Sequence, residues 1–148
     1  MYEILILVKA RDKITGDILA VKKVRMDLDS DGFPVTSIRE IKILNSALHT
    51  NIIKLKEVVV GFKKDSIFLV FEYCEVDLVK MIEKMRKFKF YFDLGDVKSI
   101  MIQLFKGVDY MHKNYILHRD LKLSNILLNR KGVIKIADFG LARNYSNM

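Results

Sequence analysis

Two short polar motifs near the end of the chain carry residue types that can do chemistry. The first, His-Arg-Asp-Leu-Lys-Leu-Ser-Asn, spans residues 118–125, and the second is Asp138-Phe139-Gly140. Asp120 can accept a proton from a hydroxyl, Lys122 can neutralise an anion, and Asn125 and Asp138 offer oxygen atoms, the ligand type that Mg²⁺ prefers. Phosphoryl transfer requires a base, a cation and two magnesium ligands. Either motif alone is weak evidence, but both in this order predict that chemistry.

A lysine in the first half of the chain supplies a second candidate cation. Lys22 follows Ala20 and Val21 in a β-rich run, and strand alternation places Lys23 on the opposite face. Glu40 is the candidate partner of Lys22. Glu40 also follows Ser37 by three residues, the spacing of a helix capping box, so it could cap its own helix instead. The two interpretations are compatible if the helix moves between states.

Hydrophobic periodicity predicts an α+β fold in which strands dominate the first half. A helix should begin near Ser37, because Ile38, Ile41, Leu44 and Leu48 form an apolar stripe. Two further helices are predicted over residues 77–87 and 96–113. The predicted strands cover residues 3–10, 18–26, 55–61, 67–73, 126–128 and 133–136, with turns at 13–17 and 63–65 and a loop at 29–34.

The last helix should be long and amphipathic, with its apolar side chains on one face. A protein that leaves such a face uncovered tends to aggregate or to bind a partner. The apolar positions are Val97, Ile100, Met101, Leu104, Val108 and Met111.

Composition and charge limit the class of protein. The chain has 148 residues, 51% of them hydrophobic, a formal net charge of +8 and one cysteine, Cys74. A single cysteine excludes an intrachain disulfide and fits a reducing compartment, the nucleus or the cytoplasm. The apolar run at residues 4–8 is too short for a signal peptide, and no stretch approaches a membrane span of about 20 residues. We expect no membrane partner.

Basic residues concentrate on the predicted helix at 77–87 and just after it. The simplest interpretation is a solvated helix face. A nucleic-acid or acidic-partner surface is the alternative, and it is weakly supported because no base-reading motif accompanies the charges. The residues are Lys80, Lys84, Arg86, Lys87 and Lys89.

These motifs together resemble those of eukaryotic protein kinases. The helix sequence Pro34-Val35-Thr36-Ser37-Ile38-Arg39-Glu40 is similar to the cyclin-binding helix of the P-I-T-S-L-R-E subgroup of cyclin-dependent kinases. The runs at 58–61, 66–70 and 73–75 are most similar to the cyclin-dependent kinase 10 subgroup. The resemblance implies a small β-rich lobe with one regulatory helix (1–73), a hinge (72–77) and the first part of a helical large lobe (78–148). It also implies an ATP- and Mg²⁺-dependent serine/threonine kinase that binds a cyclin through residues 34–40.

The resemblance also assigns roles around an adenine pocket. Ala20 and Leu127 would sandwich the base, and Phe71 would close the back of the pocket. Glu72 and Cys74 would meet adenine through their backbone, and Asp77 would reach the ribose. Phe139 would pack against the regulatory helix. Three arginines, Arg39, Arg119 and Arg143, would converge on a phosphorylated residue of the activation segment.

The chain departs from the kinase pattern in two places. Alignment puts two positions of the glycine-rich phosphate loop at Tyr2 and Leu5, where side chains hinder close backbone approach. The sequence also stops soon after Gly140, so the chain looks truncated at both ends. We therefore expect weak nucleotide binding, and we keep an alternative function: an inactive, truncated kinase that acts as a cyclin-binding module.

Overall fold

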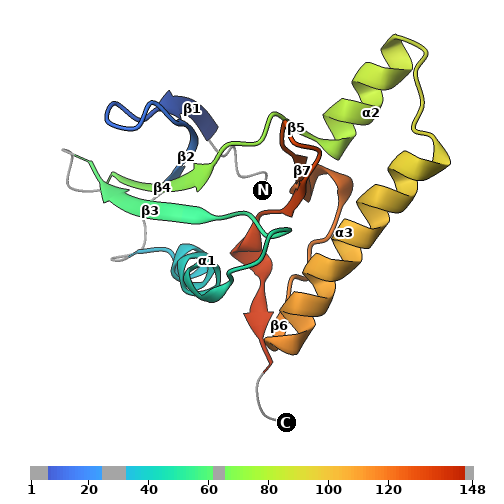
Figure 1. Cartoon of the computed structure of the whole chain (residues 1–148). Coiled ribbons are helices and arrows are strands. Elements are labelled where there is room, and N and C mark those ends of the chain that lie inside the picture. Colours follow the sequence, from blue (N-terminus) through green and yellow to red (C-terminus); the bar gives the residue numbers. More distant parts are fainter. Residues whose placement is uncertain (1–6, 25–32, 62–65, 146–148) are drawn as a thin grey trace.

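The computed structural model describes residues 7–24, 33–61 and 66–145 (Figure 1). Its first part is a four-stranded antiparallel sheet in the order β1-β2-β4-β3. Leu19, Ala20 and Val24 of β2 are buried, as expected for a central strand. The strands are β1 (Leu7–Arg11), β2 (Ile18–Val24), β3 (Leu55–Val60) and β4 (Ile67–Glu72).

Helix α1 (Val35–Ser46) packs against one side of this sheet (Figure 1). It begins after Pro34, and no side chain caps its first turn. The capping-box interpretation of Ser37 and Glu40 is therefore wrong: Ser37 lies inside the helix, and the Glu40 side chain is directed to Lys22 instead. The helix also ends before Leu48, which is 74% exposed, so the predicted apolar stripe is only partly buried.

The second part of the chain is built on two helices and short strands. Helix α2 begins at Leu78 because Asp77 caps it, with its carboxylate accepting from the Lys80 amide at 2.9 Å. The elements are β5 (Val76–Asp77), α2 (Leu78–Lys87), α3 (Leu94–Lys113), β6 (Ile116–Leu117), β7 (Ile126–Leu128), β8 (Ile134–Ile136), β9 (Arg143–Asn144) and 3-10 turns at Leu123–Asn125 and Phe139–Leu141.

Helix α3 begins two residues earlier than its apolar pattern predicted. Asp93 and Asp96 form a capping box in which each carboxylate accepts from the other residue's backbone amide. Met111 is fully buried and much of the predicted stripe packs on the core, but Val97 is 45% exposed. Phe105, outside the stripe, is 62% exposed. The apolar surface of α3 is thus broader than one buried face.

The other sequence predictions differ from the structure by one or two residues at element ends. Strands β3 and β4 stop at Val60 and Glu72, and β8 starts at Ile134. The predicted strand ends at 3–6 and 25–26 and the turn at 63–65 lie outside the described residues, as does most of the loop at 29–34. Strands β5, β6 and β9 were not predicted, and the division of the chain into lobes at residues 72–77 stays a prediction.

One segment after α1 connects the sheet to the second part of the chain. The Ile53 amide donates to the Ile136 carbonyl and the Ile136 amide donates to the Asn51 carbonyl, both at 2.9 Å. The Asn51 side chain donates to the Ile134 carbonyl at 3.1 Å. These bonds fix β8, and therefore the Asp138 motif that follows it, relative to the sheet. In the described residues, none of the helices has the length and apolar character needed to cross a membrane.

We predict that Gly107→Ala destabilises the fold, although alanine is the better helix former. A Cβ at Gly107 in α3 would lie 2.7 Å from Ile136 Cδ1, in the fully buried core, and 3.3 Å from the Asn51 carbonyl. Overpacking costs about 1–3 kcal/mol, which exceeds the gain in helix propensity of up to about 1 kcal/mol. Urea unfolding should show that the free energy of unfolding of Gly107→Ala is about 1 kcal/mol lower than that of the parent. A variant more stable than the parent would contradict the close packing at Gly107.

Candidate active site

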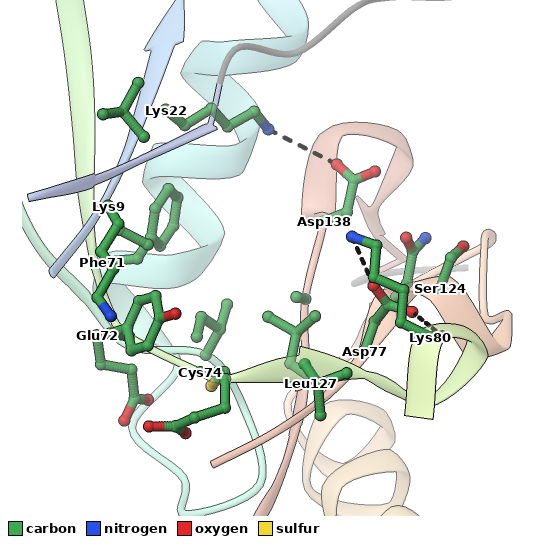
Figure 2. Close-up of a pocket in the computed structure, with 18 of the residues that line it drawn as sticks. Lys9, Lys22, Phe71, Glu72, Cys74, Asp77, Lys80, Ser124, Leu127 and Asp138 are labelled. Carbon is green, nitrogen blue, oxygen red and sulfur yellow. Dashed lines mark hydrogen bonds and ion pairs between the residues drawn. The ribbon is translucent and has the colours of Figure 1, made fainter. Parts of the chain in front are cut away.

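A cavity of about 450 Å³ lies between the sheet and the segment around Asp138 (Figure 2). Apolar side chains from β2, β4 and β7 form part of its wall, and Lys22, Glu40 and Asp138 lie together at one end, here named the charged end. All the predicted nucleotide-binding residues line it: Ala20, Lys22, Phe71, Glu72, Cys74, Asp77 and Leu127.

An ion pair between Lys22 and Glu40 joins the sheet to α1 at the charged end of the cavity. Lys22 Nζ lies 2.8 Å and 3.0 Å from the two carboxylate oxygens of Glu40. The two side chains are only 14% and 4% exposed, so solvent screens the pair little. Lys22 Nζ also lies 3.7 Å from Asp138 Oδ1. Figure 2 marks this ion pair with a dashed line. The expected pair is therefore formed, and it points the ammonium group at the Asp-Phe-Gly motif.

Asp138 is held in an unusual backbone conformation. Its φ of 65° lies in the left-handed region, which costs a non-glycine residue about 1–3 kcal/mol. Phe139 compensates, because its side chain is fully buried and packs edge-on against the His118 ring at 4.8 Å between centroids. Burial of Phe139 thus directs the Asp138 carboxylate into the cavity.

A second polar cluster surrounds Asp120. Lys122 Nζ lies 2.7 Å from Asp120 Oδ2, and Asn125 Nδ2 donates to the Asp120 carbonyl at 2.9 Å and to Oδ2 at 3.0 Å. The hydrogen bond from Lys122, and then that from Asn125, lower the pKa of Asp120 below its ordinary value. The same bond raises the pKa of Lys122. Asp120 is therefore an ionised acceptor beside a cation.

The His118 ring forms hydrogen bonds that connect this cluster to the segment before Asp138. Its Nδ1 accepts from the Asp120 amide at 3.3 Å, so Nε2 carries the proton and donates to the Ala137 carbonyl at 3.0 Å. Burial lowers the pKa of His118 and keeps the ring neutral near pH 7. One imidazole thereby connects the backbone of the first motif to the residue before Asp138.

At the end of the cavity where the resemblance places adenine, the side chains of Glu72 and Asp77 bind other residues of the chain. The Glu72 carboxylate pairs with Lys135 at 2.8 Å and also accepts from the Lys54 amide at 2.8 Å. Burial raises the pKa of the Cys74 thiol to about 12, so it is neutral. Asp77 is partly desolvated, but hydrogen bonds to Lys80 outweigh this and lower its pKa. Asp77 therefore stays charged at the cavity rim.

Sequence reasoning missed several of the residues that line the cavity, and two of these are cations, Lys80 and Lys9. Lys80 pairs with Asp77 at 3.1 Å, which the cap spacing could have indicated. Lys9 of β1 lies 4.7 Å above the Tyr73 ring, a cation–π contact between distant segments that no local pattern reveals.

The three predicted phosphate-binding arginines share one region. Desolvation, and then the positive charges of Arg39 and Arg119, lower the pKa of Arg143. Arg119 has a φ of 66°, and its Nε donates to the Leu141 carbonyl at 2.7 Å. Mutually repelling guanidinium groups held together in this way form a site suited to an anion such as phosphate.

The donor set fits a magnesium ion bound together with a phosphate. Asn125 and Asp138 both line the cavity, and the Asn125 amide nitrogen is used by Asp120, which leaves its oxygen for a cation. Mg²⁺ commonly takes one or two protein oxygens and completes its shell with phosphate and water. Within the described ranges, no cluster of three or more His, Cys, Asp or Glu residues offers an all-protein metal site.

Comparison with known proteins decides the family. Residues 6–148 match the protein kinase domain. The chain belongs to the protein kinase domain family. It is 52% identical over 140 residues to cyclin-dependent kinase 10 of Mus musculus and 51% identical over 142 residues to cyclin-dependent kinase G-2 of Oryza sativa subsp. indica. It is 46% identical over 142 residues to cyclin-dependent kinase 11A of Homo sapiens.

These matches cover nearly the whole chain but only part of each relative. They span 95–96% of this chain, against 38% of cyclin-dependent kinase 10, 20% of cyclin-dependent kinase G-2 and 18% of cyclin-dependent kinase 11A. The mixed α+β architecture agrees with a kinase domain.

We predict strong coupling between Lys22 and Glu40 in a double-mutant cycle. Glu40→Leu leaves a largely buried ammonium group without its main partner and should cost about 3 kcal/mol of stability. Lys22→Met together with Glu40→Leu should recover at least half of this loss, because both charges are removed. The free energy of unfolding of each variant is measured with urea. If the losses from the two single substitutions simply add in the double variant, the interaction between Lys22 and Glu40 contributes nothing to stability.

We also predict that His118 makes stability dependent on pH. The unfolded histidine binds its proton near pH 6.5, whereas the folded residue does so only at lower pH. The contribution of His118 to the free energy of unfolding is therefore complete above about pH 6.5. It is lost as the pH falls through the lower pKa of the folded state. His118→Gln should flatten the stability profile between about pH 7.5 and 5.5, and the exposed control His112→Gln should not. Equal slopes in both variants would contradict this.

Proposed function

We propose that this chain binds Mg-ATP in the cavity and forms the catalytic part of a cyclin-dependent serine/threonine protein kinase. One observation carries the proposal: Lys22, oriented by Glu40, lies 3.7 Å from Asp138 at the charged end of an apolar cavity. A cation fixed in this position suits the phosphates of a nucleotide whose base occupies the apolar end. The network of Asp120, Lys122 and Asn125 supplies the groups that act on a hydroxyl.

The proposed reaction is in-line transfer of the γ-phosphoryl group of ATP to a serine or threonine hydroxyl. Asp120 accepts the hydroxyl hydrogen bond and finally its proton, while the hydroxyl oxygen forms the new P–O bond. The bond from the γ-phosphorus to the bridging oxygen breaks, and ADP leaves with that electron pair. Lys122 and Lys22 offset the phosphate charge. Magnesium, when held by Asn125 and Asp138, supplies further neutralisation of the phosphates.

The names of the relatives support a cyclin as partner. The surface of α1 agrees with such a contact, since Val35 is 57% and Ile38 is 49% exposed on a helix that also holds Glu40. A cyclin bound there could fix Glu40 against Lys22. We propose the nucleus or the cytoplasm as the location, on the basis of the single cysteine and the cyclin partner.

A second function uses the same helix without catalysis. The chain could act as an inactive module that binds a cyclin, and the exposed Val35 and Ile38 are the observation that favours it. Nucleotide binding separates the two functions, because only the kinase requires it.

We predict that the purified chain binds Mg-ATP weakly and through Lys22. Calorimetric titration should give a dissociation constant of about 0.1 mM or weaker, equivalent to about −5.5 kcal/mol. Lys22→Met should weaken binding at least tenfold by removing the phosphate cation, whereas Lys23→Met, on the exposed face of the same strand, should not. Parent and Lys22→Met proteins with equal affinities would contradict the proposed site. In the complete kinase–cyclin complex, Asp120→Asn should abolish phosphate transfer.

We predict that Ile38→Asp prevents a cyclin from co-purifying with the chain. The substitution would bury an unpaired charge in the proposed interface. Ile14→Asp is the matched control, because Ile14 is 96% exposed in the β1–β2 turn. Asp120→Asn should leave cyclin binding intact. Retention of cyclin by Ile38→Asp would exclude α1 as the contact.

A further inference from the structure

The corner between α2 and α3 combines exposed aromatic side chains with uncompensated positive charge. Figure 1 shows it at the outer edge of the molecule, away from the four-stranded sheet. We define the basic-aromatic corner as residues 84–91 together with Leu94. Residues 84–91 read Lys-Met-Arg-Lys-Phe-Lys-Phe-Tyr and include four cations and no carboxylate.

The apolar side chains of the corner are unusually exposed for their size. Phe88 is 60%, Phe90 68%, Tyr91 76% and Leu94 89% exposed. Single exposed apolar residues are common on protein surfaces, but several together indicate an interaction site.

The cations of the corner have no partners in the described part of the chain. Lys80 and Lys113, on the same two helices, form ion pairs with acidic neighbours, whereas Lys84, Arg86 and Lys87 form none among the described residues. The acidic residues closest in sequence are Glu83, Asp93 and Asp96. The last two use their carboxylates to cap α3. The positive charge is therefore directed to solvent.

The backbone presents these side chains in a fixed arrangement. The Phe90 amide donates to the Met85 carbonyl at 2.9 Å, and the Lys89 amide donates to the Arg86 carbonyl at 3.0 Å. This pair of bonds is a Schellman motif, in which the residue after the helix is normally glycine. Here it is Lys89, with a φ of 58°. A cation thus occupies a position where backbone geometry favours a residue without a side chain.

From this surface we infer that the basic-aromatic corner docks onto an anionic lipid bilayer. Aromatic and aliphatic side chains enter the headgroup region while neighbouring lysines and arginines contact acidic headgroups. Neither the active-site cavity nor the smaller cavity beside His49 and Lys135 includes any residue of the corner, so its side chains form an open surface. Leu94, the most exposed member, favours lipid over nucleic acid because it has no ring to stack on bases.

This inference does not depend on the proposed catalytic function and revises two sequence-based expectations. The sequence favoured a solvated face for these basic residues, with a nucleic-acid or acidic-partner surface as the weaker alternative, and predicted no membrane partner. The structure adds the exposure of Phe88, Phe90 and Tyr91 on the same surface as the cations.

A single tryptophan can report on docking directly, because the chain contains none. In Phe90→Trp the new indole should shift its emission to shorter wavelength when vesicles of phosphatidylserine and phosphatidylcholine are added, but not with phosphatidylcholine alone. Ile14→Trp, in the exposed β1–β2 turn, should show no shift with either. No shift at position 90, or equal shifts at both positions, would overturn the proposal.

Sedimentation with the same vesicles tests the charges. Each cation removed should weaken binding about fivefold, so Lys84→Gln with Lys87→Gln should weaken it about 25-fold. The matched control, Lys13→Gln with Lys131→Gln, removes two exposed charges elsewhere and should have far less effect. Equal weakening by both pairs would overturn the proposal.

Two further results separate docking from folding and from nucleic-acid binding. Lys89→Gly should weaken vesicle binding about fivefold while raising the melting temperature, because glycine suits the left-handed conformation. A lower melting temperature would mean that the Schellman geometry is wrong and would remove the basis for a rigid corner. Displacement of vesicles from Phe90→Trp by single-stranded polyuridylate at equal phosphate concentration would show a nucleic-acid surface instead and overturn the proposal.

Discussion

The arrangement of the cavity depends on where the Lys22 ammonium group is held. Lys22 belongs to the sheet, Glu40 to α1 and Asp138 to the segment after β8, so one cation connects three separate parts of the chain. Removing two charges from water is costly, and a buried pair is retained only where the geometry recovers that cost. Here the two contacts from Glu40, at 2.8 and 3.0 Å, supply that geometry. If α1 moved away, Glu40 would no longer orient Lys22, and the ammonium group would no longer be fixed beside Asp138 in the cavity.

The rest of the site follows from burial rather than from charge. Phe139 occupies the core and so fixes Asp138 in a backbone conformation that an isolated peptide avoids. His118 contacts Phe139 and bonds the Ala137 carbonyl, which links the Asp120 cluster to the same core. Bonds between Asn51, Ile53 and the strand β8 then hold this core on the sheet. The side chains proposed as catalytic come from distant positions and are thereby placed by the burial of Phe139 and a few hydrogen bonds.

The sequence predicted the parts of this structure that local patterns encode. The six longer strands and three helices were predicted to within a few residues where the structure describes them, because alternation and helical periodicity carry that information. The site residues were predicted from motif spacing and from the kinase resemblance. Strands β6 and β9, two residues each, arise only from tertiary pairing and have no local pattern.

Other features were mistaken or missed for the same reason. Ser37 and Glu40 have capping-box spacing, but the Glu40 carboxylate instead accepts from Lys22, which lies on a strand eighteen residues earlier. The contact of Lys9 with Tyr73 and the left-handed Lys89 are likewise set by packing and helix closure, not by residue type. The exposure of Phe88, Phe90 and Tyr91 became visible only in three dimensions.

The central claim is that Lys22 faces the phosphates of a bound nucleotide, and lysine protection tests it most directly. The chain is treated with an amine-acylating reagent with and without saturating Mg-ATP, and labelling is read by mass spectrometry. Lys23, exposed on the next position of the same strand, is the internal reference. The account predicts that Mg-ATP protects Lys22 and leaves Lys23 unchanged. Equal labelling of Lys22 with and without Mg-ATP would contradict it.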